Sequence, residues 1–543
     1  LKTIKNREDK KIIKGKLQAN LNGENETVYI FRLGGIKIAN IYENGKIEIK
    51  AKIPAISKTL MSQTKNYKLP IEKTIVKSYI LKKAKFRTDL HTHMNANLTP
   101  DLLISLGIAR QIRYPLYYIK KLNLKMSKIQ EEKITKQRKI VEKQFENSNL
   151  TGKYLTRKID DNTFINFADF ILNNLENAEY NIPKIRSSLA ILKDGQAVFT
   201  NLEKVYLYRY IFAKGTDSEE KIKLEENLIE KIPEKDIIEY VKQILKDHKE
   251  GSKYQNNNLR QDKLLWIARE YKRQGIKYVE IANTDLVKNG IPAIEFLEEV
   301  HSVMPKIEEE TGVTIRFLAA IRRIPLTIVK DQKTSASYLR ENLDMIKAVN
   351  KSPYVVGSDI IGEEINDITE LKPLITELVE YVTKEDPDFT IRIHAGENDS
   401  LRENVSKSIE MVIDATPKGA KIPKVRLGHG LYTPELESEE GKKLVENLKK
   451  SKAVLEFQLT SNVRLNNLNA LENHPIKKYL ERGINCVQGT DGCGFYGSDT
   501  IDEQLALQNL LDLKNEDFMK MRKVEDKIIE DSKKYFEKKK KKL

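Results

Sequence analysis

The sequence FRTDLHTH, at residues 86–93, is typical of a short strand that ends in two histidines. Phe86, Thr88 and Leu90 alternate along one side of the run, and His91 and His93 end it. Because alternate residues of a strand point to the same side, the two imidazole rings should project together. A strand end of this kind can present two nitrogen ligands to one metal ion.

Seven further short runs of apolar and β-branched residues follow this one. From the second run onward they begin 29 to 40 residues apart, and most gaps carry a helix-period pattern. This alternation predicts parallel βα units, so the fold class is α/β, and eight units favour a closed TIM (β/α)8 barrel over an open doubly wound sheet. The seven later runs are residues 277–282, 314–321, 354–359, 389–394, 425–429, 454–458 and 485–490.

Four of the seven histidines lie at or just beyond the end of an expected strand. They are His91, His93, His394 and His429, and Asp491 follows the eighth strand. In a barrel these strand ends share one face, where active sites are built. Nitrogen and oxygen ligands that converge there predict one catalytic Zn²⁺ per active site. We interpret the remaining histidines as structural: His248, His301 and His474.

Several motifs occur in the order and spacing of a known family. The chain resembles the adenosine deaminase family of metal-dependent hydrolases from residue 86 to about residue 513, interrupted by one long insertion. Each motif alone is a weak signal, whereas the ordered set is specific. The motifs are DLHTH (89–93), VVGSDIIGEE (355–364), HAGE (394–397), LGHG (427–430), LTSN (459–462), HPI (474–476) and GTD (489–491).

The resemblance and the residue types together suggest how a metal would be used. His91, His93, His394 and Asp491 would hold Zn²⁺, which lowers the pKa of a bound water. His429 would orient that water and is not a main ligand in the family. The expected reaction is hydrolytic deamination of adenosine, AMP or ATP to the inosine form, with release of ammonia.

Four further residues complete the expected site. Glu397 would shuttle protons, donating to a ring nitrogen as hydroxide adds to the neighbouring carbon. Gly362, Gly396 and Asp359 are expected to contact the substrate, since glycine permits close approach of the backbone to a flat ring. In the family, the glycine that matches Gly362 donates its N–H to the purine.

The chain departs from the family pattern at two places. The family usually has a second aspartate after the metal aspartate, where this chain has Gly492, and an aspartate-glycine pair where it has Asn95 and Ala96. We therefore expect a nucleotide such as AMP or ATP rather than free adenosine. The layout also resembles deaminase-like proteins of bacterial antiphage systems, which implies an antiviral effector with a defence-system partner.

Two alternative functions remain open. The first keeps the barrel and the metal but acts on another amino-substituted ring or amide, and Gly492 is its main support. The second is a nucleic-acid-binding or scaffold protein with a degenerate barrel, suggested by the lysine-rich insertion and the lysines at 538–542. The intact ligand set with Glu397 argues against the second alternative. Zinc deaminases of the cytidine type are excluded because their paired cysteines are absent.

Composition restricts the cellular setting. The formal net charge is +16, and Cys486 and Cys493 are the only cysteines, which suits a reducing cytoplasm. There is no apolar run of about 20 residues, so we expect no membrane partner. From charge alone we do not expect nucleic acid as a partner. We expect a homo-oligomer, and residues upstream of Leu1, since the chain does not start with Met.

The chain divides into three expected parts. Residues 1–85 form a small β-rich N-terminal module, with strands at 28–33, 36–42 and 46–53 joined by hairpin signals. We interpret it as a packing or oligomer-contact module, and the end of a sensor domain is the alternative.

The other two parts follow it directly. Residues 86–520 form the barrel, with a large helical insertion after strand 1 at about 105–265. Residues 521–543 form a basic C-terminal helix or tail, whose terminal lysines we expect to be solvated.

Overall fold

The computed structural model of the chain covers the barrel almost completely. It describes six strands before residue 50, and then residues 86–191, 199–249, 258–287, 290–323, 335–362, 364, 367–464, 474–509 and 511–542.

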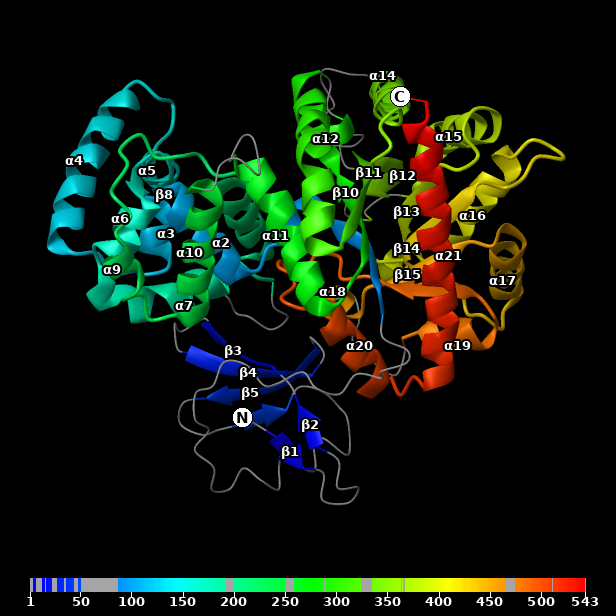
Figure 1. Ribbon diagram of the computed structural model, residues 1–543, viewed down its shortest axis with the longest axis horizontal. Coiled ribbons are helices and arrows are strands. Elements are labelled where there is room, and N and C mark those ends of the chain that lie inside the picture. The colour runs from blue at the N-terminus through cyan, green and yellow to red at the C-terminus, as the bar shows by residue number, and fades with distance from the viewer. Residues whose placement is uncertain are drawn as a thin grey trace.

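Eight parallel strands form a nearly closed barrel, which confirms the expected TIM architecture (Figure 1). Each strand pairs with its neighbour in sequence order, and each begins within two residues of the expected start. The open doubly wound alternative is therefore excluded. The strands are β7 (Thr88–His93), β10 (Tyr278–Asn283), β11 (Thr314–Arg322), β12 (Val355–Ile361), β13 (Thr390–Ala395), β14 (Lys424–His429), β15 (Val454–Phe457) and β16 (Asn485–Gln488).

The barrel closes between β7 and the residues just after β16. The Asp491 N–H donates to the His91 carbonyl over 2.8 Å. Asp89, which is fully buried, accepts from the Thr490 hydroxyl at 2.5 Å and from the Thr490 N–H at 3.2 Å. This closure places Asp491 beside the two histidines of β7.

Helices surround the strands in the order that βα units require (Figure 1). Their apolar faces are buried against the barrel, as on helix α12, where Phe296, Val300 and Met304 are at most 1% exposed. The helices after β10 are α12 (Ile291–Thr311), α14 (Ser335–Val349), α15 (Lys372–Lys384), α16 (Asn404–Ala415), α17 (Glu439–Ser451), α18 (Leu459–Arg464), α19 (Ile476–Glu481) and α20 (Thr500–Asn509).

The segment between β7 and β10 forms a helical lobe at the side of the barrel (Figure 1). Its core contains aromatic residues that contact one another, such as Tyr114, Phe167 and Phe212. One short antiparallel pair, β8 (Arg113–Pro115) with β9 (Phe164–Asn166), was not expected. The helices are α2 (Pro100–Arg110), α3 (Leu116–Lys121), α4 (Lys128–Gln144), α5 (Gly152–Asp161), α6 (Phe167–Leu172), α7 (Ala178–Ser188), α8 (Asn201–Tyr206), the π-helix η4 (Leu207–Ala213), α9 (Glu226–Ile229), α10 (Lys235–Lys249) and α11 (Leu259–Gln274).

The N-terminal residues contain a four-stranded antiparallel sheet below the lobe and barrel (Figure 1). Its first strand, β3, was not expected, and residues 50–53 of the third expected strand lie outside the described residues. The sheet lies against α7, α18 and α20. Its strands are β3 (Lys16–Leu21), β4 (Thr27–Leu33), β5 (Ile36–Tyr42) and β6 (Ile47–Ile49), and a separate pair comprises β1 (Thr3–Lys5) and β2 (Ile12–Lys14).

The C-terminal helix α21 spans Asn515–Lys540 and lies across the barrel base, at the N-terminal ends of the strands (Figure 1). Its residues Val524, Ile528 and Ile529 pack on a buried cluster of Leu90, Tyr278, Val454 and Val487 from four strands. The expectation of solvated terminal lysines is wrong for Lys539. That ammonium is buried and donates to the carbonyl of Val355 at 2.7 Å and to the side-chain oxygen of Asn350 at 2.6 Å.

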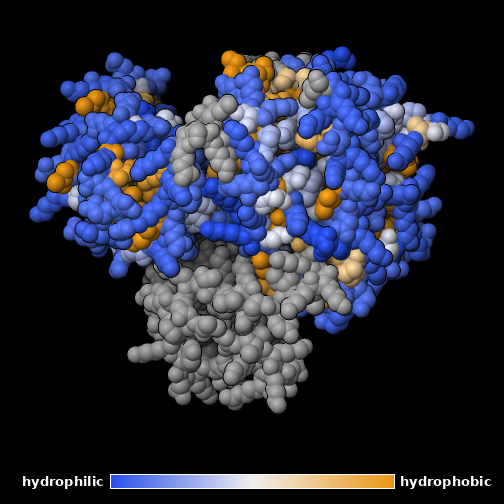
Figure 2. Space-filling model, in the orientation of Figure 1, coloured by the Kyte–Doolittle hydropathy of each residue, from blue (hydrophilic) through white to orange (hydrophobic). Residues whose placement is uncertain are grey.

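The face of the molecule seen in Figure 2 is hydrophilic over most of its area, with apolar residues in scattered spots. Both cysteines are buried and free. Among the described helices, none combines the length and apolarity needed to cross a membrane.

Candidate active site

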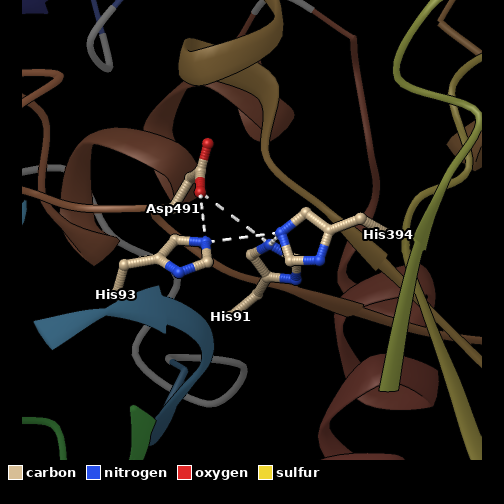
Figure 3. Close-up of side chains that lie close together, drawn as sticks. All are labelled: His91, His93, His394 and Asp491. Atoms are coloured by element: carbon tan, nitrogen blue, oxygen red, sulfur yellow. Dashed lines mark hydrogen bonds and ion pairs between the residues drawn. The ribbon is translucent and has the colours of Figure 1, made fainter. Parts of the chain in front are cut away.

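Three histidines and one aspartate converge at the C-terminal ends of the strands (Figure 3). The Nε2 atoms of His91 and His394 lie 3.1 Å apart, and those of His394 and His93 lie 3.3 Å apart. Asp491 Oδ1 lies 3.1 Å from His93 Nε2 and 3.8 Å from His91 Nε2. The structure thus brings together the four predicted ligands from β7, β13 and the segment after β16.

The spacing of these four atoms fits a single metal ion. Ligand atoms on a tetrahedral Zn²⁺, with bonds of about 2.0–2.2 Å, lie about 3.4 Å apart. The observed separations of 3.1–3.8 Å bracket that value. Three imidazoles and one carboxylate are also a donor set that zinc accepts.

A buried carboxylate holds the second ring nitrogen of two of these histidines. Glu456 Oε2 lies 2.7 Å from His91 Nδ1, and Asp359 Oδ1 lies 3.1 Å from His394 Nδ1. Both carboxylates are fully buried. Such partners fix the ring orientation and leave Nε2 free for a metal.

These two carboxylates belong to a chain of charges that runs through the barrel interior. Arg392 donates to Asp359 at 2.6 Å and lies 3.7 Å from Glu456. Arg426 lies 3.1 Å from Glu456 and also pairs with Glu280. Sequence reasoning missed this network. The sequence feature that could have revealed the network is the presence of charged residues inside strands whose other residues are mostly apolar, as in TIRIHA and KVRLGH.

Asp359 therefore lies elsewhere than expected. We predicted a substrate contact, yet its carboxylate is occupied by Arg392 and His394 and has no exposed surface. The charge of Arg392, together with His394, holds the pKa of Asp359 well below its usual range despite burial. Its place behind the metal cluster makes it a positioning residue for His394.

Glu397 is held beside the cluster by a second glutamate that sequence reasoning did not single out. Glu364 accepts from the backbone N–H groups of Gly396 at 2.9 Å, Glu397 at 2.7 Å and Asn398 at 3.0 Å. This fixes the turn after β13 and directs the Glu397 side chain toward His429, with Oε2 3.7 Å from His429 Nε2. An acid just beyond Gly362 was the only sequence signal for this role.

The two residues expected to move protons, Glu397 and His429, both have shifted pKa values. Burial raises the pKa of the Glu397 carboxyl to about 7, so this acid can both donate and accept a proton near neutral pH. Burial lowers the pKa of His429, but the carboxylates of Glu397 and Asp491 outweigh it and raise the pKa above its ordinary value. His429 Nδ1 faces Asn462 Oδ1 at 3.2 Å, which leaves Nε2 directed toward Glu397.

The backbone is left-handed at several positions around the cluster. His429 has φ 73° and Asp491 has φ 61°, conformations that non-glycine residues rarely adopt and that often mark functional sites. Gly396 has φ 78°, and a Cβ there would lie 2.6 Å from Val405 Cγ2. Gly362 has φ 108° at the end of β12. Both glycines are thus required by the chain path beside the site.

The two departures from the family pattern contact each other. Gly492 has φ 149°, and a Cβ at this position would lie 2.3 Å from Ala96 Cβ and 3.0 Å from the Ala96 carbonyl oxygen. An aspartate at position 492 would therefore clash with the alanine that replaces the family glycine. The two changes form one altered wall of the site.

The helical lobe contributes a positive charge to the mouth of the site. Arg209, on η4, is half-buried, and its pKa is lowered by burial and by the like charge of Arg322 at the end of β11. The charges of Tyr496 and Asp491 raise the pKa of Arg209 and so partly offset this lowering. No sequence pattern pointed to Arg209, because it comes from a distant segment.

The other three histidines lie apart from the metal cluster. His248 Nε2 lies 3.0 Å from both Asp262 oxygens, and His301 Nε2 lies 2.9 Å from Ser352 Oγ. His474 is buried against Phe457. These partners agree with the structural interpretation.

Comparison with known proteins gives a consistent result. A family model for adenosine deaminase matches residues 255–541, more than half of the chain. An adenosine deaminase of Plasmodium gallinaceum is 35% identical over 32% of this chain and 42% of its own length. An N6-methyl-AMP deaminase of Danio rerio is 24% identical over 44% of this chain and 63% of its own length. The chain thus spans about half the length of the curated relatives it matches.

Among solved structures, an adenine deaminase from Arthrobacter aurescens aligns at a TM-score of 0.44 and 16% identity, over 80% of this chain and 90% of its own. An Arabidopsis N6-mAMP deaminase aligns at a TM-score of 0.44 and 15% identity, over 84% of this chain and 98% of its own.

The matched segment contains His394, Glu397, His429 and Asp491, whereas His91 and His93 lie before it. In the fold, β7 contacts the matched segment, because the Asp491 N–H donates to the His91 carbonyl. The chain belongs to the adenosine deaminase family.

Proposed function

We propose that the protein catalyses metal-dependent hydrolytic deamination of an adenine nucleoside or nucleotide, giving the inosine form and ammonia. The observation that carries the proposal is the convergence of four metal-binding atoms beside Glu397, a carboxylic acid with a pKa of about 7. We further propose Zn²⁺ as the metal, one per site, because the donor set and spacing suit it.

His91, His93, His394 and Asp491 would hold the ion. When bound, it supplies a water that is acidic enough to act as hydroxide near neutral pH. His429, whose Nδ1 faces Asn462, would orient that water through Nε2. Glu397, fixed by Glu364, protonates a ring nitrogen as the neighbouring carbon gains oxygen. The resulting carboxylate would then take the proton of the added hydroxyl and pass it to the departing amino group, so that a carbonyl and ammonia form. The proton that the water loses on becoming hydroxide would restore the acid form of Glu397.

Gly362 and Gly396 would form the floor against which the ring lies. A side chain at Gly396 would meet Val405 and the Tyr432 carbonyl oxygen, so the backbone itself faces the site. The Gly362 N–H, at the end of β12, is the proposed donor to the purine.

The substrate that we favour is a nucleotide. The charge of Arg322 lowers the pKa of Arg209, and a phosphate bound beside Arg209 would offset that repulsion. Asp491 raises the pKa of Arg209, which supports a position of this cation near the proposed metal ligands. Free adenosine offers no anion to this part of the site.

A second candidate is hydrolysis of another amino-substituted ring. The Gly492–Ala96 contact favours it, because the wall lacks the aspartate that family members present to the purine imidazole. Asn95→Asp and Ala96→Gly combined with Gly492→Asp would restore the family pattern and should raise activity on free adenosine, whereas Gly492→Asp alone should impair the protein through the clash.

The test of the proposed function is ammonia release by zinc-loaded protein with adenosine, AMP, ADP and ATP in parallel. Glu397→Gln should lower kcat by about 10²–10⁴-fold without loss of zinc. Glu403→Gln, an exposed glutamate paired with Lys407, is the matched control and should keep full activity. If the zinc-bound protein released no ammonia from any of the four compounds, the proposal would be rejected.

The antiviral effector role, a homo-oligomer, a defence-system partner and a cytoplasmic location remain predictions. They rest on the sequence resemblance and composition.

A further inference from the structure

A cavity of about 620 Å³ lies between helix α21 and the base of the barrel. Its walls include Val356, Thr390 and Val454 from the strands, and Val524 and Ile528 from α21. The metal cluster lies at the opposite, C-terminal ends of the same strands. The cavity volume is in the range of small-molecule sites, about 300–1,000 Å³.

The side chains around this cavity carry an excess of positive charge. Seven lining residues are basic and three are acidic, an excess of four. Lys424 is paired with Asp388 and Asp531, at 3.6 and 3.8 Å. Within the described part of the chain, four of the basic residues form no ion pair: Lys421, Lys452, Lys523 and Lys527. Lys523 and Lys527 are one helical turn apart, where like charges repel.

A buried guanidinium reaches the inner wall. Arg426 is 4% exposed and lines the cavity. It pairs with Glu280 and Glu456, yet its Nη1 has no hydrogen-bond partner among the described residues. A buried N–H donor without a partner is unfavourable, so this atom points to an acceptor from outside the chain.

The apolar walls limit what that acceptor is attached to. Val356, Val454, Val524 and Ile528 would surround an uncharged body deep in the cavity, with the free lysines around it. An inorganic anion would leave these walls without contacts, and a neutral apolar molecule would leave the cations unpaired. The complementary ligand is therefore amphipathic and carries more than one negative charge.

We propose that the cavity under α21 is a second ligand site, which binds a small organic phosphate through its apolar ring and its dianion. The ring lies between the strand residues and α21. The phosphate is held by Lys523 and Lys527, and the ester oxygen that joins it to the ring accepts from Arg426. This site is independent of the proposed deaminase activity.

The probe is 1-naphthyl phosphate, titrated into the zinc-loaded protein by isothermal calorimetry. We expect saturable binding, with 1-naphthol and inorganic phosphate each binding at least tenfold more weakly. The double variant Lys523→Glu/Lys527→Glu should weaken naphthyl phosphate binding at least tenfold. The matched control is Lys533→Glu, an exposed lysine of the same helix that does not line the cavity, and it should bind as the wild type does.

A second variant, Val524→Trp, fills the cavity without changing its charge and should also abolish binding. Thermal melting verifies that each variant is folded. Equal affinity of the wild type and the folded double variant would overturn the proposal, because the ligand would then lie elsewhere. Absence of saturable binding to the wild type would overturn it as well.

Discussion

The two ends of the barrel are built from the same eight strands but differ in kind. At the C-terminal ends, the strands finish in histidines, an aspartate and glycines, and residues 429 and 491 have left-handed backbones. At the base, Leu90, Tyr278, Val454 and Val487 form an apolar layer that α21 covers. Two left-handed non-glycine residues and the converging donor atoms lie at the first end, and an apolar layer lies at the second.

This difference assigns chemistry to one end and stability to the other, as is usual in this fold. The two ends are nonetheless connected. Glu280 and Arg426 face the basal cavity, and the charge chain continues through Glu456 to His91. The interior is thus a scaffold for the metal ligands rather than only a packed core.

The largest effect should come from removing a metal ligand. His394→Ala deletes one of the four converging donors, so bound zinc should fall from about one ion per chain to a small fraction, with deamination lost. Elemental analysis of the purified protein measures the zinc. His301→Ala, an exposed histidine outside the cluster, should retain both zinc and activity. Full zinc content in His394→Ala would contradict the assignment.

At the base, Phe518→Ala should lower stability without affecting the metal. Phe518 is fully buried on α21, with its ring 5.7 Å from that of Phe86. The cavity left behind should lower the free energy of unfolding by about 3–5 kcal/mol, measured by urea denaturation. Met519→Ala, at a neighbouring exposed residue, should change it little. Loss of zinc from folded Phe518→Ala would break the division between the two ends.

Asp359→Asn tests the connection between interior and site. The substitution removes the charge that holds His394 Nδ1, and zinc affinity should fall by about 10–100-fold. Competition with a chromogenic chelator measures this change. Asp367→Asn, on the surface with Lys407, serves as the control. Unchanged affinity in Asp359→Asn would show that the carboxylate does not position the ligand.

The smallest effect is a pH dependence of stability at the base. Burial raises the pKa of Glu525 on α21 from 4.5 to about 8, so the folded chain keeps a proton that the unfolded chain releases. The contribution of this group to stability should therefore be fully present below pH 4.5 and be lost as pH rises toward about 8. Glu525→Gln should reduce this pH-dependent loss in the free energy of unfolding by on the order of 1 kcal/mol. Parallel pH profiles of urea denaturation for the two proteins would contradict the effect.

The strands and the convergence of His91, His93, His394 and Asp491 could be predicted because their signals are local. Apolar runs of regular spacing predicted the eight strands. Histidines at the ends of these runs predicted which side chains would converge. The position of Asp491 beside β7 followed from barrel closure alone.

The parts that could not be predicted depend on contacts between distant segments. We assigned Asp359 to substrate binding from the sequence. Its actual position behind His394 depends on its pairing with Arg392, a contact that the sequence does not reveal. The burial of Lys539 depends on acceptors from residues 350, 352 and 355. Arg209 lies near Asp491 only because η4 of the distant lobe packs beside the segment after β7, where the neighbouring Tyr208 donates to the Leu98 carbonyl.

The most direct test is a crystal structure of the zinc-loaded protein with anomalous diffraction data collected above the zinc edge. One peak should lie about 2.0–2.2 Å from the Nε2 atoms of His91, His93 and His394 and from Asp491 Oδ1. A peak among Glu397, His429 and Asp491, whose donor atoms also lie within 4.8 Å of one another, would contradict the ligand set. Absence of any peak among the four side chains would contradict the account of a metal centre.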